Sequence, residues 1–408
     1  MSALALILHK RGVQVSGSDA QENPQVRELQ RRGIRVNIGH REKNLSKSHT
    51  AENCRIIING AIADSNPELS EARKRDLEIV DRATLLAEIA STYKNVIAIA
   101  GTHGKSTTTA MIGTIFKFAG TNPTIHNGAT SNQSQNLSNL SLGGDEYFIT
   151  EACEFKRSFL TLRPTTAVIT NISPDHMDCY KDVHELNGAF DQFAQQSGKT
   201  IHARDLVAEN IVEYAPSKYS FDFMDMKIEL NVVGRHNVDN AMAAVSVALE
   251  HEIDKDTIVS ALKSFGGIMR RFETLGNIEG RRWSCDIISD YAHHPNEIAT
   301  TIATAERLYK KYLIIFQPHT YTRTKFLHAD FVELLRNVDI VFYKTYSARE
   351  KPIKGARAKD LARHLDKPYF STKFALRRAV RDIAEHYDAI IFTGAGDIDA
   401  IARSIIKS

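Results

Sequence analysis

A strand that runs into a glycine-rich turn and then a helix constrains this sequence more than any other feature. Residues Asn95–Ala100 are apolar and β-branched, which is typical of a buried strand. The segment Gly101-Thr-His-Gly-Lys-Ser-Thr107 follows and leads into a helical pattern. In this layout backbone N–H groups close around phosphate oxygens, Lys105 reaches the outer phosphates and Ser106 can bind Mg²⁺. Ile99 stands where the usual eight-residue loop has glycine, so we predict a shorter form of the loop. The alternative, an ordinary glycine turn, accounts poorly for the buried strand and the extra hydroxyls.

The composition is that of an ordinary globular protein. Charged residues make up 25% and hydrophobic residues 42% of 408 positions, a length at which two or three domains are expected. The net charge of +3 is too small to predict nucleic-acid or membrane partners, and no apolar run approaches the ~20 residues that span a bilayer. The four cysteines are widely separated, and the start of the chain lacks the features of a signal peptide. We therefore expect no zinc site, no disulfide framework and a cytoplasmic location.

Strand-like and helix-like stretches alternate along almost the whole chain, which predicts parallel sheets covered by helices. The expected strands are Val13–Ser18, Ile34–Gly39, Arg55–Gly60, Leu77–Asp81, Asn95–Ala100, Tyr147–Glu151, Thr166–Ile172, Cys285–Tyr291, Tyr312–Gln317, Ile340–Thr345 and Ala389–Gly394. They fall into three sets, so we predict an α/β fold with three domains at residues 1–92, 93–267 and 268–408. One biased stretch, residues 132–144, is expected to be a surface loop.

Acidic and histidine side chains follow two of the expected strands. Glu151 and Glu154 stand at the end of one, and ligands of α/β sheets gather at the carboxyl ends of strands. We favour Glu151 as a second Mg²⁺ ligand beside Ser106; an acid at a helix N-terminus is the alternative. Glu154 is either a partner of that site or simply solvated. The turn Asp175-His-Met-Asp178 sets a histidine between two acids, for which a metal or phosphate role and a structural role are both open.

A polar segment, Gly234-Arg-His-Asn-Val-Asp-Asn240, precedes a helical pattern farther along the chain. Asn237 and Asn240 are suited to cap that helix, and an asparagine side chain also pairs well with an adenine edge. The sequence alone leaves both readings open.

Two further polar turns follow expected strands near the C-terminus. Asp290-Tyr-Ala-His-His-Pro-Asn-Glu297 opens a helix at its proline and is predicted to be a substrate turn whose adjacent histidines point to different sides. Gln317-Pro-His-Thr-Tyr-Thr-Arg323 repeats the theme with His319 and Arg323, an arginine being suited to grip a carboxylate. Thr393-Gly-Ala-Gly-Asp397 adds a strand–glycine–helix turn.

Taken together and in this order, these motifs resemble the Mur ligases over nearly the whole chain. The matching segments are Gly101–Thr107, Glu151–Glu154, Asp175–Asp178, Gly234–Asn237, Arg270–Phe272, Asp290–Pro295, Gln317–Arg323 and Gly394–Asp397. The members that use L-alanine resemble the chain most. The resemblance implies an enzyme that uses ATP and Mg²⁺ to join the lactyl carboxylate of UDP-N-acetylmuramate to L-alanine, through an acyl phosphate, in peptidoglycan precursor synthesis.

The resemblance also implies the nature of the three domains. The first would be a truncated Rossmann-like domain that binds the UDP-sugar, and the second a P-loop ATPase-like domain. The third would be a Rossmann-like domain that takes the amino acid and closes on ATP. Family members open with a strand and a Gly-x-Gly-Gly-x-Gly turn just before a Met-Ser-x-Leu-Ala helix. Because Met1-Ser-Ala-Leu-Ala5 resembles that helix, we expect the strand and the turn to be absent from residues 1–92.

Carried over residue by residue, the resemblance implies roles for most of these side chains. Those implied to bind the nucleotide are Gly101, Thr102, His103, Gly104, Lys105, Ser106, Thr107, His236, Asn237, Arg271 and Asp290. Those implied to face the substrates are Asp19, Tyr291, His293, His294, His319 and Arg323. The implied metal ligands are Ser106, Glu151 and His176, and the implied catalytic residues are Lys105, Glu151, His176, His293 and Arg323.

Two departures from the family pattern keep alternatives open. The stretch between Phe193 and Gly234 is shorter than in relatives, and Thr320 stands where many members have arginine. One alternative is a recycling ligase that attaches a whole tripeptide to UDP-N-acetylmuramate. The other is a catalytically inactive homologue that binds nucleotide or a partner protein.

Overall fold

The computed structural model of the protein describes residues 1–128, 139–174, 179–348 and 350–406. The chain forms two compact units. The first consists of Met1–Val207 with Asp239–Leu262, and the second of Ala208–Val238 with Lys263–Ser408. Among the described residues, no helix combines the length and the apolar character needed to cross a membrane.

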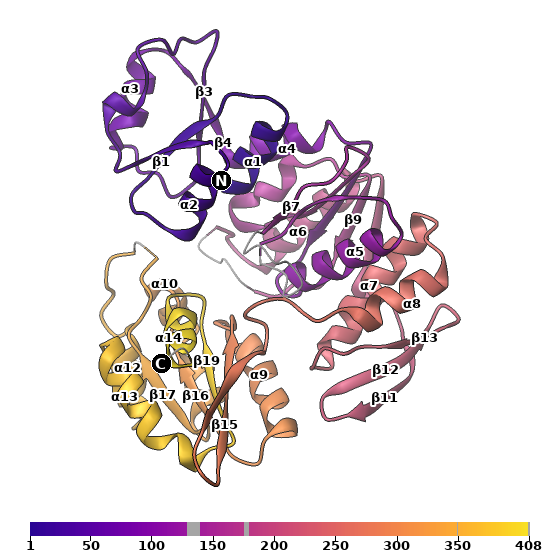
Figure 1. Ribbon diagram of the computed structural model, residues 1–408, viewed down its shortest axis with the longest axis vertical. Helices are drawn as coiled ribbons and strands as arrows, with labels where there is room; N and C mark the ends of the chain where they lie inside the picture. The colour runs from indigo at the N-terminus through magenta and orange to yellow at the C-terminus, as the bar shows by residue number, and fades with distance from the viewer. Residues whose placement is uncertain (129–138, 175–178, 349, 407–408) are drawn as a thin grey trace. The chain divides into compact units, whose positions relative to one another are not determined.

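The N-terminal part of the first unit alternates short strands and helices (Figure 1). Its elements are α1 (Ser2–Lys10), β1 (Ser16–Asp19), α2 (Pro24–Arg31), β2 (Arg35–Ile38), the 3₁₀ helix η1 (Glu42–Asn44), β3 (Arg55–Ile58), α3 (Pro67–Lys74), β4 (Glu78–Asp81) and α4 (Arg82–Ala90). Asn23 and Asn66 cap α2 and α3 with their side-chain oxygens, and a proline follows each cap as the first helical residue. The strands form two separate parallel pairs, β1 with β2 and β3 with β4.

The rest of the first unit is built on a six-stranded sheet. Its elements are β5 (Asn95–Ala100), α5 (Lys105–Phe118), β6 (Thr124–His126), β7 (Leu140–Ser141), β8 (Tyr147–Glu151), η2 (Phe155–Thr161), β9 (Thr166–Ile169), α6 (Val183–Gln195), β10 (Lys199–His202), η3 (Ala203–Asp205), and most of α7 (His236–Glu250) and α8 (Lys255–Ser264). The strand order is β10-β9-β5-β8-β6-β7, and all pairs are parallel except β6 with β7. The carboxyl ends of β5, β8, β9 and β6 therefore lie along one edge of the sheet.

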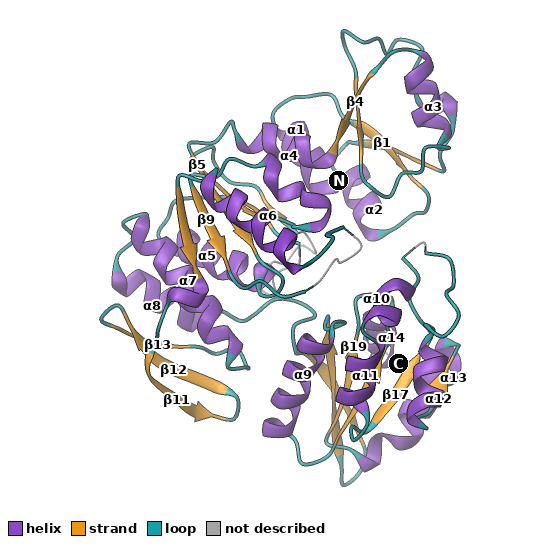
Figure 2. Cartoon of the chain, turned by 180° about the vertical axis from the view of Figure 1, so that it is seen from behind, coloured by secondary structure: helices purple, strands orange, loops and turns teal. Residues whose placement is uncertain are grey.

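Alternation along β5 divides the core of this unit into two faces. Val96, Ala98 and Ala100 pack in a cluster with buried residues of α1, α4 and α6. Ile97 and Ile99 are fully buried and point the other way, as successive strand residues must. Helix α6 lies against the sheet in Figure 2. Burial on both faces explains why β5 is an uninterrupted apolar run in the sequence.

The second unit contains two sheets. Its elements are β11 (Glu209–Ala215), β12 (Lys218–Phe223), β13 (Met226–Glu229), β14 (Glu273–Glu279), β15 (Ser284–Asp290), α9 (Pro295–Leu308), β16 (Tyr312–Phe316), α10 (Tyr321–Phe326), α11 (His328–Leu335), β17 (Ile340–Tyr343), α12 (Ala358–Leu365), β18 (Tyr369–Phe370), α13 (Lys373–Ile383), η4 (Ala384–His386), β19 (Ala389–Thr393) and α14 (Ile398–Ile406). Strands β11, β12 and β13 form an antiparallel sheet. The larger sheet has the order β14-β15-β19-β16-β17-β18, with only β14 antiparallel.

Helices cover both faces of the larger sheet. One core cluster joins Ile314 and Phe316 to buried residues of α9, α11 and α12. The opposite cluster joins Leu313 and Ile315 to buried residues of α13 and α14. Since β15, β19 and β16 are parallel neighbours, their carboxyl ends form one edge at which three of the polar turns of the sequence meet. This is the doubly wound α/β arrangement that the sequence predicted.

Each of the eleven expected strands overlaps a strand of the structure. Strands β6, β10, β14 and β18 and the antiparallel sheet β11–β13 were not foreseen. Strand β11 is mostly exposed, whereas β12 alternates apolar and polar residues, a strand signal that the expectations left out. The stretch 132–144, expected to be a loop, lies partly outside the described residues; where it is described, Leu140–Ser141 forms β7 beside β6. That expectation was therefore wrong for these two residues.

Candidate active site

The loop between β5 and α5 depends on two glycines. Gly101 has φ +136°, and a Cβ there would lie 3.0 Å from the Asn171 carbonyl oxygen. Gly104 is the N-cap of α5 in the left-handed conformation, with φ +85°. Both positions exclude larger residues, so the chain can turn sharply from the sheet into the helix. The first N–H groups of α5 are thereby presented at the carboxyl edge of the sheet, as phosphate binding requires.

The end of β9 holds this loop in shape. The Thr102 N–H donates to the Asn171 carbonyl (3.0 Å), and the His103 N–H donates to the Asn171 side-chain oxygen (3.0 Å). In return the Asn171 amide donates to the His103 carbonyl (2.9 Å), and so does the Thr170 hydroxyl (2.6 Å). These bonds fix the loop backbone before any ligand binds.

Lys105 folds back onto the loop and pairs with Glu154. Its ammonium donates to the Gly101 and Thr102 carbonyls and to both Glu154 carboxylate oxygens, the nearer at 3.0 Å. Only 16% of the Lys105 side chain and 2% of the Glu154 side chain are exposed. Burial is the largest single influence on Lys105 and lowers its pKa, but the charge and hydrogen bonds of Glu154 and the other negative groups nearby together outweigh it, so the pKa is raised and the ammonium stays charged. Glu154 is thus a partner of the site, and the alternative that it is solvated was wrong.

Glu151 and Ser106 stand on neighbouring elements of the same edge. A Glu151 carboxylate oxygen accepts the Gly128 N–H at 2.6 Å, and the Ser106 carbonyl accepts the Asn127 side-chain amide at 3.0 Å. A carboxylate and a hydroxyl are hard oxygen donors, which is the donor set that Mg²⁺ prefers. The residues present therefore fit a magnesium ion. His176, the other predicted ligand, lies outside the described residues.

Asn240 on α7 packs against the same loop. Its side-chain oxygen accepts the Thr108 hydroxyl at 3.2 Å. Asn237 donates its side-chain amide to the Val233 carbonyl at 2.8 Å. Asn240 thus contacts the phosphate loop and the helix that follows it.

In the second unit, four rings form a continuous row at the carboxyl ends of β15, β16 and β17. Tyr291 meets His293 edge-on (centroids 5.3 Å apart), His293 meets His319 (5.3 Å), and His319 stacks on Tyr346 (5.6 Å, 13° between planes). Nδ1 of His293 lies 2.9 Å from the Tyr291 carbonyl oxygen, which can only accept, so Nδ1 carries a proton. Nε2 is then the nitrogen of His293 that can take up a proton.

Arginines surround this row. An Arg323 nitrogen lies 3.2 Å from Nδ1 of His319. The Arg270 and Arg271 guanidinium carbons lie 4.7 Å and 5.3 Å from the centre of the Tyr291 ring. The result is a cationic, aromatic surface suited to an anionic substrate group.

A buried carboxylate supports the start of this row. The Asp290 carboxylate accepts the Phe272 and Ala292 N–H groups at 2.8 Å and 2.7 Å, and burial raises its pKa. These two bonds fix the turn after β15. His236, the first residue of α7, is exposed.

His294 turns away from its neighbour. Its Nδ1 accepts the Asn296 N–H at 3.3 Å, and the residue is the buried N-cap of α9. Glu297 completes a capping box at the same helix end. The two histidines do point to different sides, as the sequence indicated, and His294 is engaged in capping.

In the N-terminal part of the chain, Asp19 ends β1 and accepts the Gln21 N–H at 3.1 Å. Glu68, at the start of α3, is the hub of the neighbouring polar cluster. Its carboxylate accepts the Ser18 hydroxyl (2.6 Å) and the Asn44 amide (2.5 Å). The cluster lies at the carboxyl ends of β1 and β2, where a ligand of this domain is expected.

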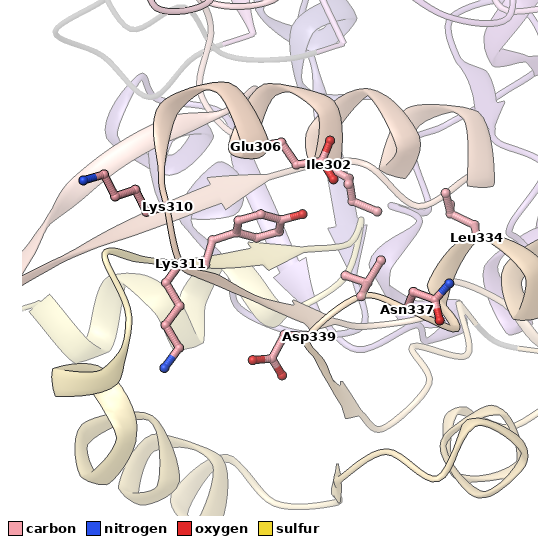
Figure 3. Close-up of a pocket in the computed structure, with 9 residues that line it drawn as sticks. Ile302, Glu306, Lys310, Lys311, Leu334, Asn337 and Asp339 are labelled. Carbon is pink, nitrogen blue, oxygen red and sulfur yellow. The ribbon is translucent and has the colours of Figure 1, made fainter.

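A separate pocket of about 400 Å³ lies at the opposite edge of the large sheet (Figure 3). Tyr312, the first residue of β16, and Asp339, just before β17, line it together with Glu306 and Lys311. None of the predicted site residues lines this pocket. Ligands of such sheets bind at the carboxyl ends of the strands, so we do not assign it to the active site.

Three domain families match the chain in order. They are the Mur ligase family catalytic domain (residues 1–94), the Mur ligase middle domain (99–208) and the Mur ligase glutamate ligase domain (270–396). The UDP-N-acetylmuramate–L-alanine ligase of Caldicellulosiruptor saccharolyticus is 38% identical over 446 residues, which cover 100% of this chain and 96% of that protein. The enzyme of the same name from Agathobacter rectalis is 34% identical, with 100% and 95% covered.

This chain belongs to the Mur ligase family. Solved structures agree with the fold of a Mur ligase. The UDP-N-acetylmuramate–alanine ligase of Thermotoga maritima superimposes with a TM-score of 0.82 at 25% identity, covering 100% of this chain and 96% of that one. A murein peptide ligase of Psychrobacter arcticus shares the fold with a TM-score of 0.73 at 22% identity and the same coverage. The predicted family and fold class are confirmed.

Sequence reasoning missed several residues that shape this Mur ligase site. Asn171, Tyr346 and Gln317 received no role, although each follows a strand and the strand-end rule could have singled them out. Gln317 donates to Asp397 at 2.6 Å and accepts the Ile398 N–H at 3.1 Å, so it joins the ends of β16 and β19. The pairing of Lys105 with the buried Glu154, which draws the lysine inward, was also not foreseen.

Proposed function

We propose that this Mur ligase joins the lactyl carboxylate of UDP-N-acetylmuramate to L-alanine with hydrolysis of ATP. Full-length similarity to curated enzymes of that activity supports the choice of substrates. The observation that carries the chemistry is the phosphate loop with Lys105 held between its carbonyls and a buried carboxylate. Neither the tripeptide ligase nor the inactive homologue is favoured by these similarities.

The reaction proceeds in two balanced steps. A carboxylate oxygen of UDP-N-acetylmuramate attacks the γ-phosphorus of ATP, and the bond from that phosphorus to the bridging oxygen breaks. The products of this step are ADP and an acyl phosphate. The amine nitrogen of L-alanine then attacks the acyl carbon, inorganic phosphate leaves, and the nitrogen loses a proton. We assign the stabilisation of phosphoryl charge to Lys105 and the N–H groups of residues 101–107.

Magnesium, when bound, would neutralise charge on the phosphate oxygens. Ser106 and Glu151 would hold it, together with His176. We assign nucleotide contacts to His236, Asn237, Arg271 and Asp290.

We assign substrate contacts to Asp19 in the first unit and, separately, to the row of rings in the second unit. Tyr291, His319 and Arg323 would hold anionic substrate groups, because this surface is cationic and aromatic. His293 would take the proton of the amine at Nε2, the ring nitrogen left to accept it. We propose that His294 affects substrate binding only indirectly. As the N-cap of α9 it holds the turn that carries Tyr291 and His293.

The test is phosphate release from ATP in the presence of UDP-N-acetylmuramate. L-alanine, glycine, L-serine and the tripeptide L-alanyl-γ-D-glutamyl-meso-diaminopimelate are compared as acceptors, and mass spectrometry identifies the product. We expect L-alanine to give the highest kcat/KM, with one phosphate released for each amide formed. A higher kcat/KM for the tripeptide would replace the proposal with the recycling activity. Nucleotide binding without any phosphate release would point to the inactive homologue.

A further inference from the structure

Strand β6 ends between the two elements that carry the proposed magnesium ligands. It runs parallel to β8, with His126 opposite Thr150, so the next residues of β6 reach the end of β8 where Glu151 lies. Residues 126–128 contact the start of α5 on one side and the end of β8 on the other. Neither the sequence motifs nor the proposed mechanism uses these three residues.

Asn127 fixes the residue that carries one ligand. It is buried, and its side-chain amide donates to the Ser106 carbonyl at 3.0 Å across 21 residues of sequence. Ser106 lies in the first turn of α5, directly after Lys105. Because the carbonyl is held, the backbone of Ser106 is held as well, and its hydroxyl is presented in a limited range of directions.

Gly128 fixes the other ligand. Its N–H donates to one Glu151 carboxylate oxygen at 2.6 Å. A Cβ at Gly128 would lie 2.6 Å and 2.9 Å from the two carboxylate oxygens, and the nearest atoms it would meet all belong to Glu151. Glycine therefore leaves the space that the carboxylate occupies. The hydrogen bond from the Gly128 N–H sets the direction of the Glu151 carboxylate.

His126 ties the two strands together beside Glu151. Its Nδ1 lies 2.9 Å from the Thr150 hydroxyl, and that hydroxyl donates to the Glu151 carbonyl at 3.1 Å. Since the hydroxyl hydrogen goes to the carbonyl, Nδ1 of His126 must donate to the hydroxyl oxygen. The buried ring also stacks nearly parallel to Phe148, with 7° between the planes. The end of β6 is thereby locked to the end of β8.

We propose that His126, Asn127 and Gly128 are positioning residues that hold Ser106 and Glu151 at the separation a divalent cation needs. The proposal rests on the proposed function, because it takes these two residues as the magnesium ligands. Outer partners of metal ligands typically change metal affinity by about 10–100-fold when they are removed. The proposal locates such partners in one short segment that contacts both ligands.

The experiment measures binding of a non-hydrolysable ATP analogue by calorimetric titration, in Mg²⁺ and in EDTA. Asn127→Asp keeps the size of the side chain but removes the donor to Ser106, and Gly128→Ala adds one methyl group against Glu151. We expect the ratio of affinities, Mg²⁺ over EDTA, to fall at least tenfold in each variant, while the affinity in EDTA stays within about twofold of wild type. Unchanged ratios in both variants, or equal losses in both media, would overturn the proposal.

Matched variants separate positioning from folding. Gly188→Ala, on α6, has nothing within 4 Å of the added carbon and should leave the ratio unchanged. His126→Asn places an amide nitrogen near the position of Nδ1 and should retain most of the ratio, whereas His126→Leu should lose it. Should Asn127→Asp fail to fold in a thermal melt, Gly128→Ala decides alone. If the wild-type protein bound the analogue equally well with and without Mg²⁺, the proposed metal site itself would be refuted. If the wild type depended on Mg²⁺ and the variants kept the same dependence, only the positioning role would be refuted.

Discussion

Both units present polar groups at the carboxyl ends of parallel strands, but the kind of group differs between them. In the first unit, the groups presented to a ligand are backbone N–H groups of the phosphate loop, and side chains hold that backbone in place. The Asn171 side chain accepts from and donates to His103, and Lys105 bonds to the loop carbonyls and to Glu154. In the second unit, the rings from Tyr291 to Tyr346 and the nearby arginines are held mostly by side-chain contacts. Backbone donors suit a ligand group that never varies, such as a phosphate. Side-chain surfaces suit substrates that differ from one relative to the next, because they change with single substitutions.

Lys105→Ala is expected to have the largest effect, and it tests whether the phosphate loop of the first unit carries the phosphoryl chemistry. We expect ligation to fall at least a hundredfold, since a contact to the transferring phosphoryl group contributes about 2.7 kcal/mol or more. The variant should also lose stability by about 3–5 kcal/mol, because it leaves the buried Glu154 charge without its partner. Steady-state kinetics and chemical denaturation measure the two effects.

The double variant Lys105→Ala/Glu154→Gln is the control. It should recover most of the stability and none of the activity. A Lys105→Ala enzyme that kept more than about a tenth of the wild-type rate would contradict the assigned role, since 1.4 kcal/mol already corresponds to tenfold.

A second prediction uses His126, the buried histidine of the first unit. Burial, with the charge of Arg82, lowers its pKa to about 3. A folded-state pKa below the ordinary 6.5 means that the unfolded chain takes up the proton first. His126 is neutral above pH 6.5 and has no effect there; between pH 6.5 and about 3 it should reduce the free energy of unfolding by about 1.4 kcal/mol per pH unit.

Chemical denaturation at pH 7.0, 5.5 and 4.5 tests this. His126→Gln should flatten the pH dependence relative to wild type. If this substitution left the slope unchanged, burial of the neutral ring would not be what makes the protein sensitive to acid.

A third prediction separates the two carboxylates of the first unit. Glu151→Gln should raise the Mg²⁺ concentration for half-maximal rate about tenfold, because an amide is a poorer ligand for a hard cation than a carboxylate. Glu154→Gln should change it less, since Glu154 contacts Lys105. Titration of Mg²⁺ at saturating ATP compares them, and the opposite order would show that the wrong carboxylate was assigned.

The smallest effect is expected from the row of rings. His319→Ala should raise the KM for UDP-N-acetylmuramate or L-alanine about threefold to tenfold, because each ring pair contributes about 0.5–1.5 kcal/mol. Tyr346→Phe retains the stacked ring and should behave like wild type. Calorimetry should show unchanged ATP affinity in both variants; a parallel loss of ATP affinity would mean that the row belongs to the nucleotide site.

Local patterns in the sequence were enough for the strands with apolar runs and for the edge on which the chemistry lies. The apolar run before Gly101, the proline after His294 and the polar residues after each of these strands are short-range signals, and a strand of the structure overlaps every expected position. Strands β6, β7, β10, β14 and β18 and the antiparallel sheet β11–β13 were not foreseen, although β12 carries the alternation that is typical of a strand.

Which side chains meet was decided only by the tertiary structure. Lys105 pairs with a residue 49 positions away, and Ser106 is held by one 21 positions away. Nothing near Glu154 in the sequence distinguishes a buried ion-pair partner from a solvated acid, and nothing near His294 distinguishes a helix cap from a substrate contact. The sequence by itself determined the strands with apolar runs, the turns that follow them and the family, because these depend on neighbouring residues. The partners of each polar group depend on how the strands are ordered across the sheet, and only the assembled fold sets that order.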